Sequence, residues 1–238
     1  MRARHAALAL AAAATGAAAQ QNVCNAAFAS MGTSYDLSAT HHTAAQGAYN
    51  VRDVRSYSTN YYFNPCDQVP NPDMTVCNSA GSNWTVATGW QIERPYTGNP
   101  SCYRLGGLAS GGWNFTLFDD NYPDRGVVLT FLNGDGQWCP NSQPRTLSLE
   151  FTCDATINPA SATYALGVSV REENTCDYRV QIPSLAGCPL ECTTGGNLCN
   201  GHGVCGYNND AQRTQCYCYN GWGGNRCDTG ECAQWRRA

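Results

Sequence analysis

The sequence predicts an all-β domain, built as a sandwich or flattened barrel, followed by a small disulfide-rich module. Between residues 22 and 190 there is no convincing helical periodicity, and short strand-like runs alternate with turn clusters. Such a series of short strands is typical of sandwiches and barrels. Between residues 192 and 227, six cysteines are crowded into a segment that is too short to fold without disulfides.

The first 19 residues are predicted to be a signal peptide. Arg2 and Arg4 form a basic start, residues 7–14 an apolar stretch, and residues 17–19 a run of small residues suited to cleavage. The 15 cysteines of the chain favour an oxidising compartment. No later segment approaches the roughly 20 apolar residues that a membrane span needs. We therefore expect a protein of the secretory pathway or the extracellular space, either soluble or the ectodomain of a longer protein.

The composition argues against several classes of partner. Charged residues make up 13% of the chain, the net charge is −4, and the 14 basic residues are all arginines, scattered along the sequence. Scattered charges with a negative sum argue against binding to nucleic acid or to an anionic membrane. Asn83 and Asn114 each begin an N-glycosylation sequon. These features are typical of a secreted, β-rich glycoprotein.

The sequence carries no signature of an enzyme. It contains neither a Gly-x-Ser-x-Gly nor a His-Glu-x-x-His motif, and no pair of its carboxylates has a spacing typical of glycosidases. His41, His42 and His202 lack companion metal ligands. We therefore predict a protein that is not an enzyme and that has neither a metal nor a cofactor.

The stretch from Arg145 to Cys153 predicts a half-buried strand that begins with a charged residue. Apolar side chains alternate with polar ones, and Arg145 falls on the apolar side. A second stretch, residues 168–182, places Glu172 and Tyr178 on its own apolar side. A guanidinium beside a core is costly unless a polar group meets it. Two interpretations are open: a buried Arg–Glu ion pair capped by the Tyr hydroxyl, or a polar pocket for a hydroxyl-rich ligand.

Short motifs along residues 22–190 resemble mannose 6-phosphate receptor homology (MRH) domains. They follow the order of that family and comprise SYDLS (34–38), YNVRDV (49–54), YYFNPC (61–66), CYRLGG (102–107), LTFLNGD (129–135) and CDY (176–178). In style they are nearest to autophagy-related trafficking proteins that carry this domain and a membrane span. The resemblance implies a flattened β-barrel or sandwich of two antiparallel sheets, with mannose bound by Gln, Arg, Glu and Tyr.

The resemblance assigns three of these four side chains by position. Arg145 stands eight residues before Cys153, as the family's arginine stands before a strand-ending cysteine. Tyr178 follows Cys176 by two residues, as the family's tyrosine follows a later cysteine. The glutamine looks like Gln91, which lies in a Trp-Gln-Ile step ahead of the Leu-Gly turn.

The glutamate is either Glu172 or Glu173, because its position varies by one among relatives. Strand parity favours Glu172 unless a β-bulge intervenes. The four residue types suit mannose, whose axial 2-hydroxyl distinguishes it from glucose: arginine donates, glutamate accepts, and glutamine and tyrosine do both. A site that bonds given hydroxyls rejects an epimer, because its own polar groups would be left unpaired.

The same resemblance implies four disulfides in the first domain, which we place at residues 22–190. They are Cys24–Cys66, Cys77–Cys102, Cys139–Cys176 and Cys153–Cys188. The last two cross each other along the chain and would clamp the strands of Arg145 and Tyr178 together.

Residues 191–228 resemble an EGF-like module. The six cysteines alone permit many pairings, but the single residue between Cys216 and Cys218 and the Gly-Trp-Gly-Gly turn that follows are typical of such modules. This resemblance implies the disulfides Cys192–Cys205, Cys199–Cys216 and Cys218–Cys227. Only Glu191 precedes the first cysteine as an acidic ligand, so we predict that the module binds no calcium.

Residues 229–238 form a tail that contains an odd cysteine, Cys232. An odd cysteine in a secreted protein suggests pairing outside the domain. We expect Cys232 to pair between chains or with a residue beyond a truncated end.

We therefore expect a secretory-pathway lectin that binds mannose-containing N-glycans, phosphorylated or not. Its ligands would be mannose-bearing glycoproteins in sorting or quality control, with the EGF-like module as a spacer or as the site of a protein partner. Two alternatives are open: a non-catalytic trafficking adaptor or receptor ectodomain with a vestigial sugar site, and an accessory subunit of a glycan-processing enzyme. The presence of all four side-chain types favours the lectin.

Overall fold

The computed structural model describes residues 23–53, 56, 58–79, 85–107, 112–159 and 169–230. The expected signal peptide, the sequon at Asn83 and the odd Cys232 lie outside these residues. Among the residues that are described, no helix is long and apolar enough to cross a bilayer.

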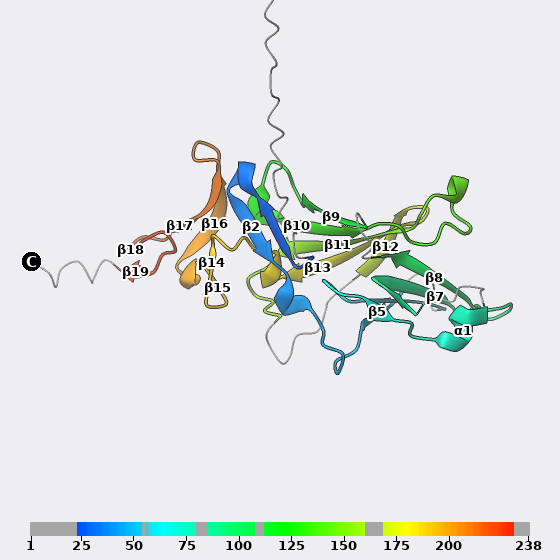
Figure 1. Cartoon of the computed structure of the whole chain (residues 1–238). Helices are drawn as coiled ribbons and strands as arrows, with labels where there is room; N and C mark the ends of the chain where they lie inside the picture. The colour runs from blue at the N-terminus through cyan, green and yellow to red at the C-terminus, as the bar shows by residue number, and fades with distance from the viewer. Residues whose placement is uncertain are drawn as a thin grey trace, which may run out of the picture.

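Two β-sheets form the larger part of the molecule (Figure 1). The five-stranded sheet has the order β12–β13–β11–β10–β9, and its strands are β9 (Trp113–Leu117), β10 (Gly126–Phe131), β11 (Thr146–Cys153), β12 (Ser169–Asn174) and β13 (Asp177–Ser184). The four-stranded sheet has the order β3–β4–β7–β8, and its strands are β3 (Tyr49–Arg52), β4 (Thr59–Phe63), β7 (Gly89–Glu93) and β8 (Ser101–Gly106). The prediction of an all-β fold with two sheets is confirmed.

The remaining elements are short. The other strands are β1 (Asn25–Phe28), β2 (Thr33–Asp36), β5 (Val69–Pro70), β6 (Val86–Ala87), β14 (Thr193–Thr194), β15 (Asn197–Leu198), β16 (Gly203–Asn208), β17 (Arg213–Cys218), β18 (Trp222–Gly223) and β19 (Thr229–Gly230). Turns of 3-10 helix are η1 (Ala29–Met31), η2 (Ser38–Thr40), η3 (Pro123–Arg125), η4 (Pro140–Ser142), η5 (Leu185–Gly187) and η6 (Cys199–Gly201). Asn114, the second sequon, is exposed on β9, and its glycosylation stays a prediction.

One strand pair in the five-stranded sheet is parallel, although the resemblance implied antiparallel sheets. Strands β11 and β13 run side by side in the same direction, with Leu147 beside Tyr178 and Cys153 beside Ser184. The other pairs in the sheet are antiparallel. Because Arg145 directly precedes β11, the parallel register brings Arg145 and Tyr178 to the same end of the sheet.

The core lies between the two sheets and follows from the alternation in the sequence. On β11, Leu147, Leu149 and Phe151 are fully buried, as their period of two predicts. Phe63 and Leu105 from the four-stranded sheet belong to the same hydrophobic cluster. Burial of the period-two side chains therefore fixes which face of β11 meets the second sheet.

Two glycines allow the sheets to approach closely. A Cβ atom at Gly89 on β7 would lie 2.6 Å from Cδ2 of Leu147, and one at Gly106 on β8 would lie 2.6 Å from Cβ of Phe131. A larger side chain at either position would force a densely packed core to shift. The close approach occurs at the end of β11 that follows Arg145.

A short helix, which the sequence analysis did not expect, lies on the outer side of the four-stranded sheet. Helix α1 (Met74–Ser79) begins after Asp73, whose carboxylate accepts a backbone N–H of the first turn at 3.1 Å. Trp90 and Ile92 of β7 belong to the hydrophobic cluster on this side. Gln91, between them, therefore points toward the five-stranded sheet, because side chains alternate along a strand.

Seven disulfides join the described cysteines. They are Cys24–Cys66, Cys77–Cys102, Cys139–Cys176, Cys153–Cys188, Cys192–Cys205, Cys199–Cys216 and Cys218–Cys227, which are the pairs that the two resemblances imply. The third and fourth bonds brace opposite ends of the parallel pair β11–β13. The site end of this pair is therefore held covalently as well as by the sheet.

The C-terminal module contacts the hairpin β1–β2, and Figure 1 shows β16 and β17 beside β2. The carboxylate of Glu191 accepts hydrogen bonds from the backbone N–H of Ser34 at 3.1 Å and from its hydroxyl at 2.6 Å. It also accepts one from the hydroxyl of Thr214 on β17 at 3.2 Å. Glu191, the acid weighed as a calcium ligand, thus joins the module to the first hairpin.

Candidate functional site

Arg145 is almost fully buried, with 4% of its surface exposed. Its Nη1 donates to the backbone carbonyls of Asp135 at 2.8 Å and Gln137 at 2.7 Å. The guanidinium carbon lies 4.0 Å from the ring centre of Tyr103. Carbonyl dipoles and an aromatic face therefore stabilise the buried cation. Its Nε has no hydrogen-bond partner among the described residues.

Tyr178 and Glu172 face each other across the antiparallel pair β12–β13. The Tyr178 side chain is 2% exposed. Burial first, and then the charge of Glu172, raise the pKa of Tyr178 to about 12, while Arg145 acts in the opposite direction. One oxygen of Glu172 accepts the backbone N–H of Cys176 at 2.7 Å. The pairing across β12–β13, and not parity along one continuous strand, therefore brings the glutamate and the tyrosine together, with the arginine close to Tyr178.

Gln91 reaches the same place from the other sheet. On β7 it stands directly between Tyr61 of β4 and Tyr103 of β8, and directly opposed residues point to the same face. Tyr103 carries the guanidinium of Arg145 on its ring, and the ring centre of Tyr61 lies 5.8 Å from that of Tyr178. Two tyrosines thus connect Gln91 to the rest of the site.

The structure separates the two candidate glutamates. A β-bulge interrupts β12 between Glu172 and Asn174, and Glu173 lies on the outer side of the sheet. There its carboxylate accepts from Nε of Arg171 at 2.7 Å, and this arginine holds the pKa of Glu173 below its usual range. Arg171 also bonds to the buried Glu150. Glu172 is therefore the glutamate that lies with Tyr178 and Arg145.

Gln91 and Arg145 leave two buried polar atoms unpaired. Among the described residues, Oε1 of Gln91 and Nε of Arg145 have no hydrogen-bond partner, although Nε2 of Gln91 donates to Glu93 at 2.9 Å. A buried polar atom without a partner costs about 1–3 kcal/mol. One of these atoms is an acceptor and the other a donor, so sugar hydroxyl groups could satisfy both.

Sequence reasoning missed the residues that support the site. Tyr61 and Tyr103 form its aromatic walls, and both lie within motifs that the resemblance had singled out without giving them a role. Asp135 also contributes, because its carbonyl holds Arg145 while its carboxylate is bonded to Arg104 at 2.8 and 2.9 Å. The bond between Arg104 and the Asp135 carboxylate thus orients the loop whose backbone carbonyl, that of Asp135, accepts from Arg145.

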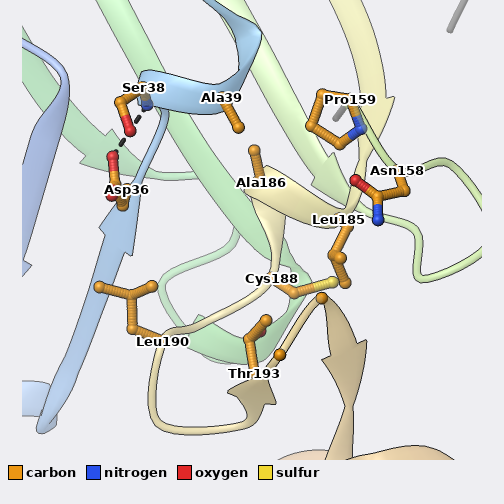
Figure 2. Close-up of a pocket in the computed structure, with 12 residues that line it drawn as sticks. Asp36, Ser38, Ala39, Asn158, Pro159, Leu185, Ala186, Cys188, Leu190 and Thr193 are labelled. Atoms are coloured by element: carbon orange, nitrogen blue, oxygen red, sulfur yellow. Dashed lines mark hydrogen bonds between the residues drawn. The ribbon is translucent and has the colours of Figure 1, made fainter. Parts of the chain in front are cut away.

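A cavity of about 410 Å³ lies elsewhere, at the junction with the C-terminal module (Figure 2). Ala39, Leu185 and Leu190 are among its lining residues, and none of the predicted site residues lines it. Asp36 faces it but already accepts the backbone N–H of Ser38 at 2.8 Å. This cavity lacks the set of converging polar groups that distinguishes the Arg145 site.

No protein-family model matches the chain, and no curated protein sequence matches it. Solved structures with similar folds include domain 11 of the echidna mannose 6-phosphate/IGF2R receptor, at 16% identity over 71% of this chain and 96% of that chain, with a TM-score of 0.43. Chicken IGF2R domain 11 also has 16% identity and a TM-score of 0.43, over 71% of this chain and 93% of that chain.

A third solved structure is the MRH domain of Yos9 complexed with the oligosaccharide alpha3,alpha6-Man5. It is 15% identical over 59% of this chain and 76% of that chain, with a TM-score of 0.34. It is a domain of the kind that the sequence motifs resemble. At such scores the function has to be argued from the side chains of the chain itself.

Proposed function

We propose that the β-domain, residues 22–190, is a lectin that binds a mannose residue of N-glycans between Gln91, Arg145, Glu172 and Tyr178. The observation that carries the proposal is that Nε of Arg145 and Oε1 of Gln91 are buried without a partner, on residues that both neighbour Tyr103. A ligand hydroxyl can donate and accept at once, so neighbouring hydroxyls on one pyranose ring suit this pair. The four side chains match in type the set that binds mannose in MRH domains.

Each side chain has a distinct role in the proposed complex. Arg145 donates from Nε and Glu172 accepts through its carboxylate. The Tyr178 hydroxyl, which is protonated at physiological pH, donates to the sugar. Gln91 accepts through Oε1. No nucleophile or general acid is needed, because the ligand is bound and not converted.

The structural alternative, a buried Arg–Glu ion pair, is less well supported. In the described part of the chain, Arg145 and Glu172 form no ion pair with each other: Arg145 bonds to two carbonyls and Glu172 to an amide, and Tyr178 lies within hydrogen-bonding reach of both side chains. A site evolved only for stability would be expected to satisfy its buried polar atoms internally. The unpaired Nε of Arg145 and Oε1 of Gln91 favour a ligand instead.

We place this activity in the sorting or quality control of mannose-bearing glycoproteins in the secretory pathway. The C-terminal module, residues 191–228, would act as an EGF-like spacer or as the site of a protein partner. The module follows the C-terminal end of β13, which the Cys153–Cys188 disulfide ties to the C-terminal end of β11. The proposed mannose site lies at the N-terminal ends of the same two strands. Eight residues of strand β11 correspond to about 26 Å, so both could be engaged at once.

A glycan array tests the proposal and identifies the ligand. We expect the wild type to bind high-mannose or phosphomannose glycans, and Arg145→Ala to lose this binding. Arg125→Ala is the control, because its exposed side chain makes only surface contacts, with Asp119 and the ring of Tyr122. Thermal melting must show that both variants fold. A folded wild type that binds no mannose-containing glycan would refute the lectin and favour the adaptor or the accessory subunit.

A further inference from the structure

We propose that the C-terminal module binds an acidic peptide segment of a partner protein in a cleft beside strand β17. The cleft has a volume of about 340 Å³, and its lining residues include Glu191, Arg213, Gln215, Cys216, Asn225 and Arg226. The proposal rests on the proposed role of the module as the site of a protein partner, and it does not depend on the mannose site. It adds the chemistry by which such a partner is recognised.

Arg213 and Arg226 are exposed residues, and neither pairs with a carboxylate within the described part of the chain. Other described arginines do form ion pairs with aspartates or glutamates, namely Arg94, Arg104, Arg125, Arg171 and Arg179. Arg226 bonds instead to two uncharged acceptors, the hydroxyl of Thr194 at 3.0 Å and the carbonyl of Leu190 at 3.5 Å. Two guanidiniums without a carboxylate therefore line one cleft, and a guanidinium binds a carboxylate through paired hydrogen bonds.

Glu191 also lines the cleft, and its charge limits what the cleft can hold. Its carboxylate accepts hydrogen bonds from Ser34 and Thr214, so it is satisfied at the junction with the first hairpin. The carboxylate of Asp228 lies close to Gly224 but is not among the lining groups. Two positive charges and one negative charge thus line the cleft, and a single carboxylate balances the remaining positive charge, whereas a doubly charged phosphate exceeds it.

The cleft follows the outer edge of β17, which suits an extended peptide. In the described structure β17 pairs in its sheet with β16 alone, and the backbone N–H of Thr214 points away from β16, donating to the carbonyl of Gly32 at 3.4 Å. Because the N–H groups of a strand alternate in direction, that of Cys216 points to the same edge. An extended segment can therefore lie along this edge, as in recognition by strand addition, while its acidic side chains reach the arginines.

Two disulfides hold the walls of the cleft in place. The first joins Cys216 of β17 to Cys199, and the second, Cys218–Cys227, closes the loop that carries Arg226. Because these walls are braced, little conformational freedom is lost when a ligand contacts them. Gln215 on β17 adds an amide group, which can donate to a carboxylate or to a peptide carbonyl. The ligand of this cleft is therefore an extended peptide with an acidic side chain.

Chemical-shift mapping of the isotope-labelled full chain tests the cleft with two peptides whose ends are blocked. One peptide alternates threonine with glutamate, and the other alternates threonine with glutamine. We expect the glutamate peptide to shift the amide signals of residues 213–216 and 224–226 saturably, and the glutamine peptide to leave them unchanged. Arg213→Gln should weaken binding by at least about fivefold, because a charge-assisted contact is lost. Arg213→Lys should keep part of the affinity, since it keeps the charge.

Arg125→Gln is the matched control, because Arg125 is an exposed arginine of the β-domain, and it should bind the glutamate peptide as the wild type does. Arg226→Gln should weaken binding as Arg213→Gln does. Thermal melting checks that the variants fold, and Arg213→Gln decides the test if Arg226→Gln unfolds.

The cleft is refuted if the glutamate peptide leaves the signals of residues 213–216 and 224–226 unchanged, or if the glutamine peptide binds equally well. Tighter binding of inorganic phosphate than of the glutamate peptide would also refute it. Shifts elsewhere in the module would refute the cleft but keep the module as the site of a partner. Titration of the same sample with methyl α-mannoside reports on the mannose site separately, so failure of one site is distinguishable from failure of the other.

Discussion

Tyr178 holds its hydroxyl where burial and the charge of Glu172 both oppose ionisation. Its pKa rises from the ordinary value of 10.0 to about 12. Below pH 10 the phenol is protonated in the folded and the unfolded chain alike. Between pH 10 and pH 12 the unfolded chain ionises first, so the free energy of unfolding falls as the pH rises.

We predict that Tyr178→Phe reduces this alkaline loss of stability. Between about pH 9 and about pH 11, the free energy of unfolding of the variant should fall by about 1 kcal/mol less than that of the wild type, because one late-ionising phenol is gone. Urea unfolding at the two pH values measures the difference. Equal losses in the two proteins would show that Tyr178 ionises normally in the fold.

The buried Arg145 side chain gives a second prediction. Arg145→Lys keeps the charge but replaces the planar guanidinium, with its five N–H donors, by one ammonium group. This group cannot bond to the carbonyls of Asp135 and Gln137 and to the ligand at the same time. We expect the affinity for methyl α-mannoside to fall at least tenfold, which corresponds to about 1.4 kcal/mol for a lost bond to a charged donor. Calorimetry measures it, and Arg125→Lys at the surface is the control. An unchanged affinity would mean that Nε of Arg145 does not touch the sugar.

These residues could be predicted to different degrees from the sequence. The parity of the strand from Arg145 to Cys153 placed the arginine on the core side, and parity also favoured Glu172 over Glu173. Gln91 carried no such signal and came from the resemblance alone. The contribution of Tyr103 could not be predicted, because contact between residues 103 and 145 depends on how the two sheets face each other.

Among the elements, the parallel pair β11–β13 determines the position of the site. It carries Arg145 and Tyr178 to one end, and two disulfides of similar loop length brace it, with sequence separations of 37 and 35 residues. Loops of this size imply about 4 kcal/mol of stabilisation for each bond. Of these two bonds, Cys139–Cys176 is the one beside the proposed mannose site.

Replacing each disulfide by two serines should therefore separate stability from binding. Both double variants, Cys139→Ser with Cys176→Ser and Cys153→Ser with Cys188→Ser, should lose similar amounts of stability in urea unfolding. Under conditions in which both remain folded, only the first should lose affinity for methyl α-mannoside, because Cys176 orients Glu172. If both variants bound equally well, the disulfide would have no part in positioning the glutamate.

At the scale of the elements, the alternating strands could be predicted from the sequence. The turns that connect them were harder to predict. Residues 168–182 look like one continuous alternating run, whereas the described part forms β12 and β13 with a tight turn between them. The turn contains no glycine, and its left-handed residue is Cys176, with a φ of +70°. Helix α1 was likewise hidden, because a six-residue helix is too short to show a helical period.

At the scale of the whole molecule, a polar junction joins the C-terminal module to the first hairpin. Glu191 bonds to Ser34 of the first hairpin and to Thr214 of the module. We predict that Glu191→Ala costs about 1–3 kcal/mol, the penalty for leaving its partners unpaired. Amide hydrogen exchange should increase in β2 and β17. Asp210→Ala, an exposed acid on the same module, is the control, and equal exchange in the two variants would argue against a carboxylate-held junction.

The module and the mannose site should nevertheless be independent in binding, since they lie at opposite ends of β11 and β13. Loosening the junction should leave the affinity for sugar unchanged. This separation fits a lectin that carries a spacer or a second binding unit, and it makes the sugar site testable by itself.

The most direct test compares Glu172→Gln with Glu173→Gln by calorimetric titration with methyl α-mannoside. The two glutamates are neighbours and undergo the same change, but Glu172 lies with Tyr178 and Arg145, while Glu173 bonds to Arg171 on the outer face. We predict that the first substitution abolishes measurable binding and that the second leaves it within about twofold of the wild type. Equal effects of the two substitutions, or a greater loss at Glu173, would contradict the proposed mannose site.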